Sequence, residues 1–225
     1  MAQISLININ SIIELAKKIV TEPREFFEQM PRHGGYSEPL IFITVMGGIA
    51  GLIAAALSFV SSGHLGSMSF GMTSIILLPV VAIVGCYIAS AIMFVIWKLM
   101  GSREDYEASF RCVAYSYVII PVVVLASVIP YVGTLLANLW WFWLVYIATL
   151  TVHKLESHKS AIVLGIIAAV LLIANLAGEK TQREFEQRHN EFNEQMSEIQ
   201  NMSPEELGEA AGEFLKGLQK SAEEN

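Results

Sequence analysis

Five long apolar stretches fill the middle of the 225-residue chain and leave only its two ends polar. A helix satisfies its own backbone hydrogen bonds and crosses a bilayer with about 20 residues, whereas a soluble fold could not hide so many such runs. Lys98 is the only charged residue inside a stretch rather than at its edge. The sequence therefore predicts an all-α integral membrane bundle with spans at about Leu40–Val60, Met72–Leu99, Tyr115–Ile129, Thr134–Val152 and Ser160–Ala177.

The net charge of −7 arises at the C-terminal end of the chain. From residue 178 onward twelve Glu stand against five Lys and Arg, which leaves nine acidic and nine basic residues in the rest of the chain. We therefore expect an amphipathic, cytoplasmic N-terminal segment (1–39), a five-helix membrane domain (40–177) and an acidic, partly helical tail (178–225).

The basic residues predict the orientation, because short loops rich in Lys and Arg stay on the cytoplasmic side of a membrane. All nine basic residues before the tail lie ahead of the first span, from the end of the second span to the start of the third, or between the fourth and fifth. The loops at 60–71 and 130–133 have none. The N-terminus is thus predicted inside and the tail outside. This depends on the short Tyr115–Ile129 stretch crossing fully, since a lost crossing would invert the orientation of every later segment.

Each polar end offers a candidate contact surface. Pro23 suits the first position of a short helix, and Phe26 and Phe27 follow on it. The helix that precedes it either packs on the bundle or lies on the membrane surface. In the tail, Ser203-Pro204 is a helix start signal. The stripe after this signal belongs either to a solvated tail or to a docking helix, and it contains Leu207, Phe214 and Leu218.

Small residues one turn apart let membrane helices approach closely, so their faces are predicted to pack against other helices. Whether those helices belong to the same chain or to a second copy is left open. The helix-packing candidates are Gly47, Gly51, Gly85, Ala89, Gly165 and Ala169.

Pro79 and Pro121 are predicted to kink their helices. Transporters use broken helices to line a substrate site, which makes a small transporter or channel the alternative function. A transporter normally also needs charge within the membrane, and none lies in the middle of a span here. Asn138 and Asn175 are more consistent with hydrogen bonds between helices than with a ligand site.

Catalytic motifs are missing from the sequence, which has one aspartate, no Gly-x-Ser-x-Gly, no glycine-rich phosphate loop and no His-Glu-x-x-His. We therefore predict no enzyme activity, no cofactor, no metal and no nucleic acid partner. Cys86 and Cys112 are expected to pack as small apolar residues. His153 and His158, with Lys154 and Lys159, are interpreted as a cytoplasmic-edge cluster that faces anionic lipid.

The order of these features resembles the YIP family of multipass membrane proteins, which is named in eukaryotes for interaction with Rab-type GTPases and also occurs in bacteria. The matching elements cover about Ile12–Ala177: Glu22-Pro23-Arg24-Glu25-Phe26-Phe27, the stretch from Gly101 through Phe110 and Ala114-Tyr115-Ser116 to Pro121, and the Trp-rich fourth span ending at His153. The resemblance implies five spans, an inner N-terminus, and membrane organisation or trafficking through protein contacts rather than catalysis. The acidic tail and the short N-terminal segment depart from eukaryotic members.

These points predict a bacterial-type member in the inner (cell) membrane. Its expected partners are the lipid bilayer and a membrane protein of unknown identity, with self-association left open. Its expected role is the non-enzymatic organisation of membrane components.

Overall fold

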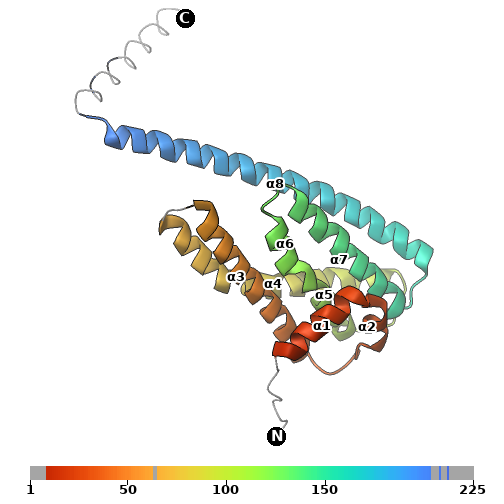
Figure 1. Ribbon diagram of the computed structural model, residues 1–225. Coiled ribbons are helices and arrows are strands. Elements are labelled where there is room, and N and C mark those ends of the chain that lie inside the picture. The colour runs from red at the N-terminus through yellow and green to blue at the C-terminus, as the bar shows by residue number, and fades with distance from the viewer. Residues whose placement is uncertain (1–8, 63–64, 204–207, 209–211, 213–225) are drawn as a thin grey trace, which may run out of the picture. The chain divides into compact units, whose positions relative to one another are not determined.

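The computed structural model describes residues 9–62, 65–203, 208 and 212, and in this part of the chain the regular secondary structure is all helical (Figure 1). Its elements in chain order are α1 (Ile9–Thr21), α2 (Pro23–Gln29), α3 (Ser37–Ser62), α4 (Leu65–Leu99), α5 (Tyr106–Ser116), the 3-10 turn η1 (Tyr117–Ile119), α6 (Ile120–Ala126), α7 (Val132–Thr151) and α8 (Ser157–Asn201).

Within this described part, five helical stretches are long and apolar enough to cross a membrane, as the sequence predicted. The third begins at Tyr106 instead of Tyr115, because α5 carries Glu107 and Arg111 and so did not register as an apolar run. The stretches are Ser37–Ser58, Thr73–Leu99, Tyr106–Ala126, Val132–Thr151 and Ser157–Glu194.

Backbone contact joins α3 to α4. A Cβ added to Gly47 would lie 2.7 Å from the Cα of Pro79, and one added to Gly51 would lie 2.7 Å from the Cα of Ile75. The hydroxyl of Ser74 also donates to the carbonyl of Gly51 at 3.2 Å. Helices in lipid gain stability from such close approach. Helix α4 continues past Pro79, which here packs against α3.

The third span consists of two helices. The break falls at Tyr117–Ile119, and Pro121 lies in the first turn of α6, where a missing N–H costs little. Every residue from Ala108 to Ser116 is buried, whereas none of the seven residues of α6 is. The core of the bundle therefore surrounds α5.

The N-terminal helices pack on this core. Pro23 begins α2 as predicted, and Phe26 meets Tyr115 of α5 edge to face at 5.1 Å between ring centroids. Ile12 and Ile19 of α1 are buried while Ile13 is exposed, so α1 packs on the bundle and still presents an apolar side chain outward.

Helix α8 runs without interruption from the fifth span into the polar tail. The chain divides into two compact units, 1–176 and 177–225. In the first, Ser160 and Leu164 of α8 are buried, but most of the helix up to residue 176 is exposed or half-buried. In the second, the ion pair of Arg183 with Glu179 (2.7 Å) joins successive turns of α8.

Candidate functional site at the charged end of the bundle

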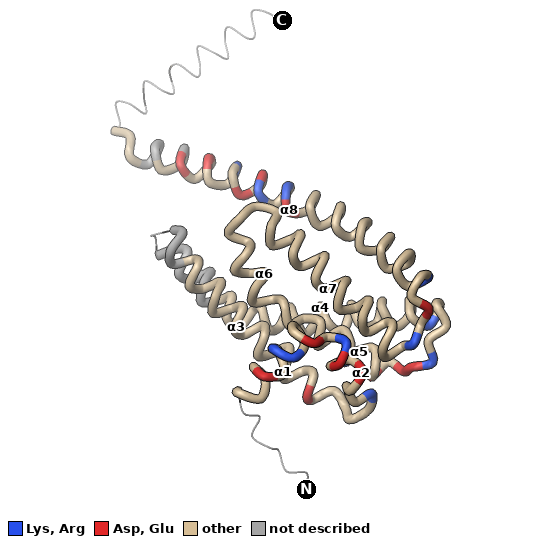
Figure 2. Tube along the Cα trace, turned by 45° about the vertical axis from the view of Figure 1, so that its right-hand side comes forward, with Lys and Arg blue, Asp and Glu red and all other residues tan. Residues whose placement is uncertain are grey.

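Charged residues gather at one end of the first unit. Figure 2 shows them over α1, α2, the start of α5 and the turn from α7 into α8, whereas the turn from α6 into α7 has none. The loops that meet at the charged end are those the sequence predicted to share one side of the membrane. We therefore looked for a site among the polar side chains at this end.

The loop between α2 and α3 is tied to the start of α5. Arg32 pairs with Glu104 (Nη1 to Oε1, 2.6 Å), and Oε1 of Glu107 accepts the backbone N–H groups of Gly34 (2.7 Å) and Gly35 (2.6 Å). Both glycines have positive φ (145° and 84°), a conformation that a residue with a Cβ adopts only under strain. The double glycine therefore lets the loop close around a single carboxylate.

Arg111 is the most deeply buried charge at this end, with 1% of its surface exposed. Its Nη2 donates to Oε2 of Glu38 at 2.7 Å and its Nη1 donates to the carbonyl of Gly35 at 2.8 Å. A buried charge is tolerated only when it is paired and hydrogen-bonded. These contacts explain how a span can contain an arginine, and they fix the first turn of α3 to α5.

His153 connects the loop between α4 and α5 to the turn between α7 and α8. Its ring stacks on Trp97 at 3.9 Å between centroids, and its Nδ1 lies 2.7 Å from the hydroxyl of Ser102. Trp97 in turn donates from Nε1 to the hydroxyl of Thr149 at 2.8 Å. The predicted lipid-facing role of His153 is therefore wrong, because the ring is buried; only His158 of that pair is exposed.

The environment of His153 keeps it neutral. Burial, together with the positive charges of Arg32 and Lys98, lowers its pKa from 6.5 to about 3. The Ser102 hydroxyl and the imidazole have the spacing of a nucleophile and its base. Among the described residues, however, no group hydrogen-bonds to Nε2 of His153, so no carboxylate orients the ring as in a catalytic triad. Since both side chains are buried, the hydrogen bond serves to join two loops.

A second cluster escaped sequence reasoning. His33, Asp105 and Glu107 each bring one potential metal ligand within 4.8 Å of the others. Asp105 also caps α5 by accepting the N–H of Ala108 at 2.9 Å, and His33 Nδ1 lies 3.3 Å from its other oxygen. The partial positive charge of the α5 N-terminus opposes a cation there. His33 and Asp105 lie far apart in sequence, so no local spacing motif could have revealed the cluster.

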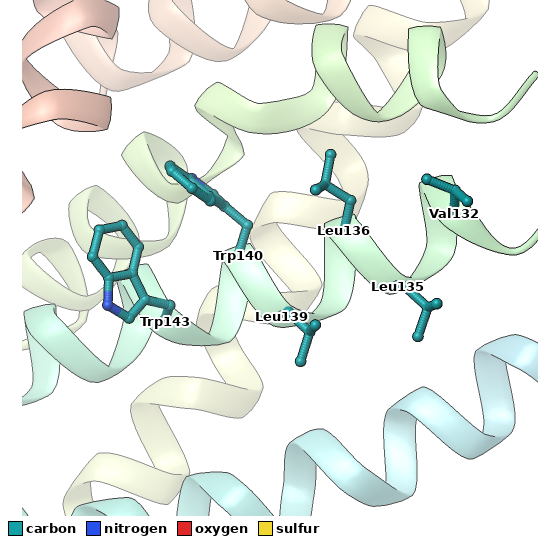
Figure 3. Close-up of a pocket in the computed structure, with 6 residues that line it drawn as sticks. All are labelled: Val132, Leu135, Leu136, Leu139, Trp140 and Trp143. Atoms are coloured by element: carbon teal, nitrogen blue, oxygen red, sulfur yellow. The ribbon is translucent and has the colours of Figure 1, made fainter. Parts of the chain in front are cut away.

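Two hollows flank α7 at membrane depth. Figure 3 shows the first, of about 400 Å³, in which Leu136 and Trp140 point to one side and Leu135 and Leu139 to the other. The second, of about 260 Å³, lies between η1 and α6, α7 and α8, and its lining includes Asn138 and Asn175. No charged residue lines either hollow.

The amide of Asn138 connects two spans. With its nitrogen turned toward α8, it donates to the carbonyl of Ala168 at 3.3 Å. This geometry matches the predicted hydrogen bond between helices. The amide therefore contributes to packing as well as to the wall of the smaller hollow.

The predicted contact surface at the N-terminal end is not available in this structure. Pro23, Phe26 and Phe27 are all buried, because α2 turns its aromatic face toward the core. The tail candidates Leu207, Phe214 and Leu218 lie outside the described residues.

Four helix-packing candidates remain: the two in α4 are half-buried, and the two in α8 are exposed. A Cβ at Gly85 would lie 3.3 Å from the Tyr117 hydroxyl, and Ala89 is half-buried. Gly165 has nothing within 4 Å of such a Cβ, and Ala169 is exposed. Within the described chain, α4 therefore uses its small residues in packing and α8 leaves its small face open.

In a comparison with known families, the sequence model of the Yip1 domain family matches residues 17–178. This range begins in α1 and ends in α8, close to the boundary between the two compact units. Neither a curated protein nor a solved structure matches the chain.

Proposed function

The chain belongs to the Yip1 domain family, and from this premise we propose that it is a non-enzymatic membrane protein that organises membrane components or supports trafficking through protein contacts. The family match over residues 17–178 carries the proposal, because it covers α2 to α7 in full and reaches into α1 and α8. The geometry of the charged end supports it. There, the buried polar groups of Arg111 and His153 hold loops and helices together.

The proposal includes an orientation: the charged end lies in the cytoplasm, the tail lies on the other side, and the membrane is a bacterial inner membrane. The positive-inside rule and five crossings support it. The test is a single cysteine at position 220 in a chain whose Cys86 and Cys112 have been replaced. Labelling of intact cells by an impermeant thiol reagent is the expected result. Labelling only after lysis would mean an even number of crossings or a reversed N-terminus.

We place the protein contacts on the polar part of α8, because the N-terminal aromatic residues are buried. Phe185 and Phe192 are 66% and 58% exposed and lie seven residues apart, hence on one side of the helix. Apolar side chains that gather on one side of a polar helix can form an interaction surface. The predicted tail stripe of Leu207, Phe214 and Leu218 stays a second candidate contact surface.

The test compares two double variants of the full-length protein. Phe185→Ala/Phe192→Ala removes the apolar side chains, and Gln187→Ala/Asn190→Ala changes polar neighbours on the same helix. We expect the first variant to lose copurifying membrane proteins while it is produced and folded like the wild type, and the second to keep them. Equal recovery of the same proteins from both would refute this contact surface.

One observation favours transport as a second candidate. The smaller hollow lies at the break before Pro121 and contains two amides, Asn138 and Asn175. Its volume is below that of most ligand pockets, which run from about 300 Å³ upward, and this weakens the case. Solute flux into vesicles containing the purified protein that falls in an Asn138→Leu variant would favour transport over the scaffold role.

A further inference from the structure

Basic residues lie in and next to two loops that a hydrogen bond joins at the charged end. The hydrogen bond between Ser102 and His153 fixes the loop after α4 against the turn after α7. Lys98 and Arg103 flank the first partner, and Lys154 follows the second. All three are exposed. We call Lys98, Arg103 and Lys154 the basic rim.

The basic rim has a surplus of positive charge. Nearby cations have acidic partners, since Arg32 pairs with Glu104 and Lys159 with Glu156 at 3.2 Å. Lys98 instead lies over the ring of Phe94 at 5.5 Å. In the part of the chain that the structure describes, no ion pair involves a member of the basic rim.

The backbone around the rim is constrained. Lys154 has φ of 50°, in the left-handed region that long side chains rarely adopt. The N–H of Leu155 donates to the carbonyl of Thr149 at 3.2 Å and closes the turn around it. Gly101, with φ of 102°, turns the chain just before Ser102, whose N–H donates to the carbonyl of Trp97 at 2.8 Å. Both loops therefore have defined backbone geometry.

The rim lies at the level of the lipid headgroups. Lys98 is in the last turn of the span Thr73–Leu99, and Lys154 lies between the spans that end at Thr151 and begin at Ser157. On α4, Leu99 is 84% exposed, and Ile92 and Val95 are exposed on the same helix face. An open apolar face of α4 thus ends beside Lys98, an arrangement that matches the acyl chain and the phosphate of a lipid.

We propose that the basic rim binds an anionic phospholipid, with the phosphate between Lys98, Arg103 and Lys154 and an acyl chain along the exposed face of α4. The occupant is a lipid rather than a soluble phosphate because the open apolar face of α4 ends beside Lys98 of the rim. This inference does not depend on the identity of a protein partner, so it can fail while the proposed function holds.

The test is native mass spectrometry of the full-length protein in detergent with equal amounts of phosphatidylglycerol and phosphatidylcholine. The wild type should retain phosphatidylglycerol preferentially. Each cation near an anionic headgroup contributes about fivefold in affinity, so Lys98→Gln/Arg103→Gln/Lys154→Gln should bind phosphatidylglycerol roughly a hundredfold more weakly. The control Lys180→Gln/Arg188→Gln/Lys216→Gln removes the same charge outside the rim and should bind like the wild type.

Three results would overturn the proposal: no preference in the wild type, equal losses in both triple variants, or full displacement of the lipid by inorganic phosphate. If the rim variant unfolds, as judged by its melting temperature in the same detergent, the single Arg103→Gln variant takes its place. That loop substitution should weaken phosphatidylglycerol binding about fivefold, and unchanged binding would count against the rim.

Discussion

Helix α5 is buried in the bundle, whereas the membrane-spanning part of α8 is mostly exposed. Of the most apolar 18 residues in the third span, which begins with α5, 61% are buried. This holds although α5 contains Glu107 and Arg111. Of the most apolar 18 residues in the α8 span, only 6% are buried, although this stretch is more apolar than the third span. Lipid chains are as apolar as leucine, so apolarity alone does not drive a helix into a bundle. Polar partners and close backbone packing determine which span becomes central.

The comparison predicts that replacing one phenylalanine strongly lowers the stability of the protein and that replacing another hardly changes it. Phe26 packs on Tyr115 of α5, so Phe26→Ala should lower the free energy of unfolding by about 4 kcal/mol through the cavity it leaves. Phe185 on α8 is exposed, so Phe185→Ala should change it by less than about 0.5 kcal/mol. Unfolding of both variants in the same detergent measures the difference. Similar stabilities would mean that α2 is not part of the core.

The ion pair of Arg111 provides the next test. Glu38→Gln removes the counter-charge of a buried guanidinium, and because Glu38 itself is exposed to solvent the change should cost about 2 kcal/mol. The matched change Glu28→Gln breaks an exposed pair with Arg24 and should cost under about 1 kcal/mol. The two variants are compared by thermal unfolding. An equal cost for both would show that hydrogen bonds to α5 contribute less than its apolar contacts.

The lowered pKa of His153 predicts that the folded protein loses stability in acid. Its pKa is lowered in the folded chain to about 3, so an unfolded chain binds the proton first. Stability from this group is fully present above about pH 6.5 and is lost as the pH falls toward 3. Between pH 7 and pH 5 the loss should be about 2 kcal/mol. A His153→Gln variant, measured beside the wild type, should lack this part of the pH dependence; identical pH profiles would contradict the prediction.

The smallest expected effect concerns α8. Asn138→Leu removes the hydrogen bond to Ala168 and should cost about 1 kcal/mol, the usual size of such bonds between membrane helices. Asn175→Leu, at an exposed position of α8, serves as the control and should have little effect. If Asn138→Leu is neutral, α8 is held in the bundle mainly through its first turns at Ser160 and Leu164.

The sequence predicted the number of spans, the start of α2 at Pro23 and the polar ends, because each depends on composition or local spacing. It placed the start of the third span nine residues late, since Glu107 and Arg111 look like loop residues until their partners are known. Those partners, Gly34, Gly35 and Glu38, lie more than 70 residues earlier in the chain.

The candidate site was harder to predict. Phe26, Phe27 and His153 were placed on surfaces because their neighbours in sequence are charged. Their neighbours in space are aromatic: Tyr115 for Phe26 and Trp97 for His153. In a membrane protein the outer surface is apolar as well, so hydrophobic periodicity does not show which side of a helix faces the core.

The pairing of Arg111 has a consequence for biosynthesis. Arg111 is the sixth residue of the third span, Tyr106–Ala126, and an arginine costs up to about 3 kcal/mol during insertion from the translocon, less near the end of a helix than at its centre. The ribosome delivers Gly35 and Glu38 well before Arg111, so the groups that neutralise the arginine are already at the membrane when the third span emerges. Insertion of the third span is then a cooperative event that requires the start of the first.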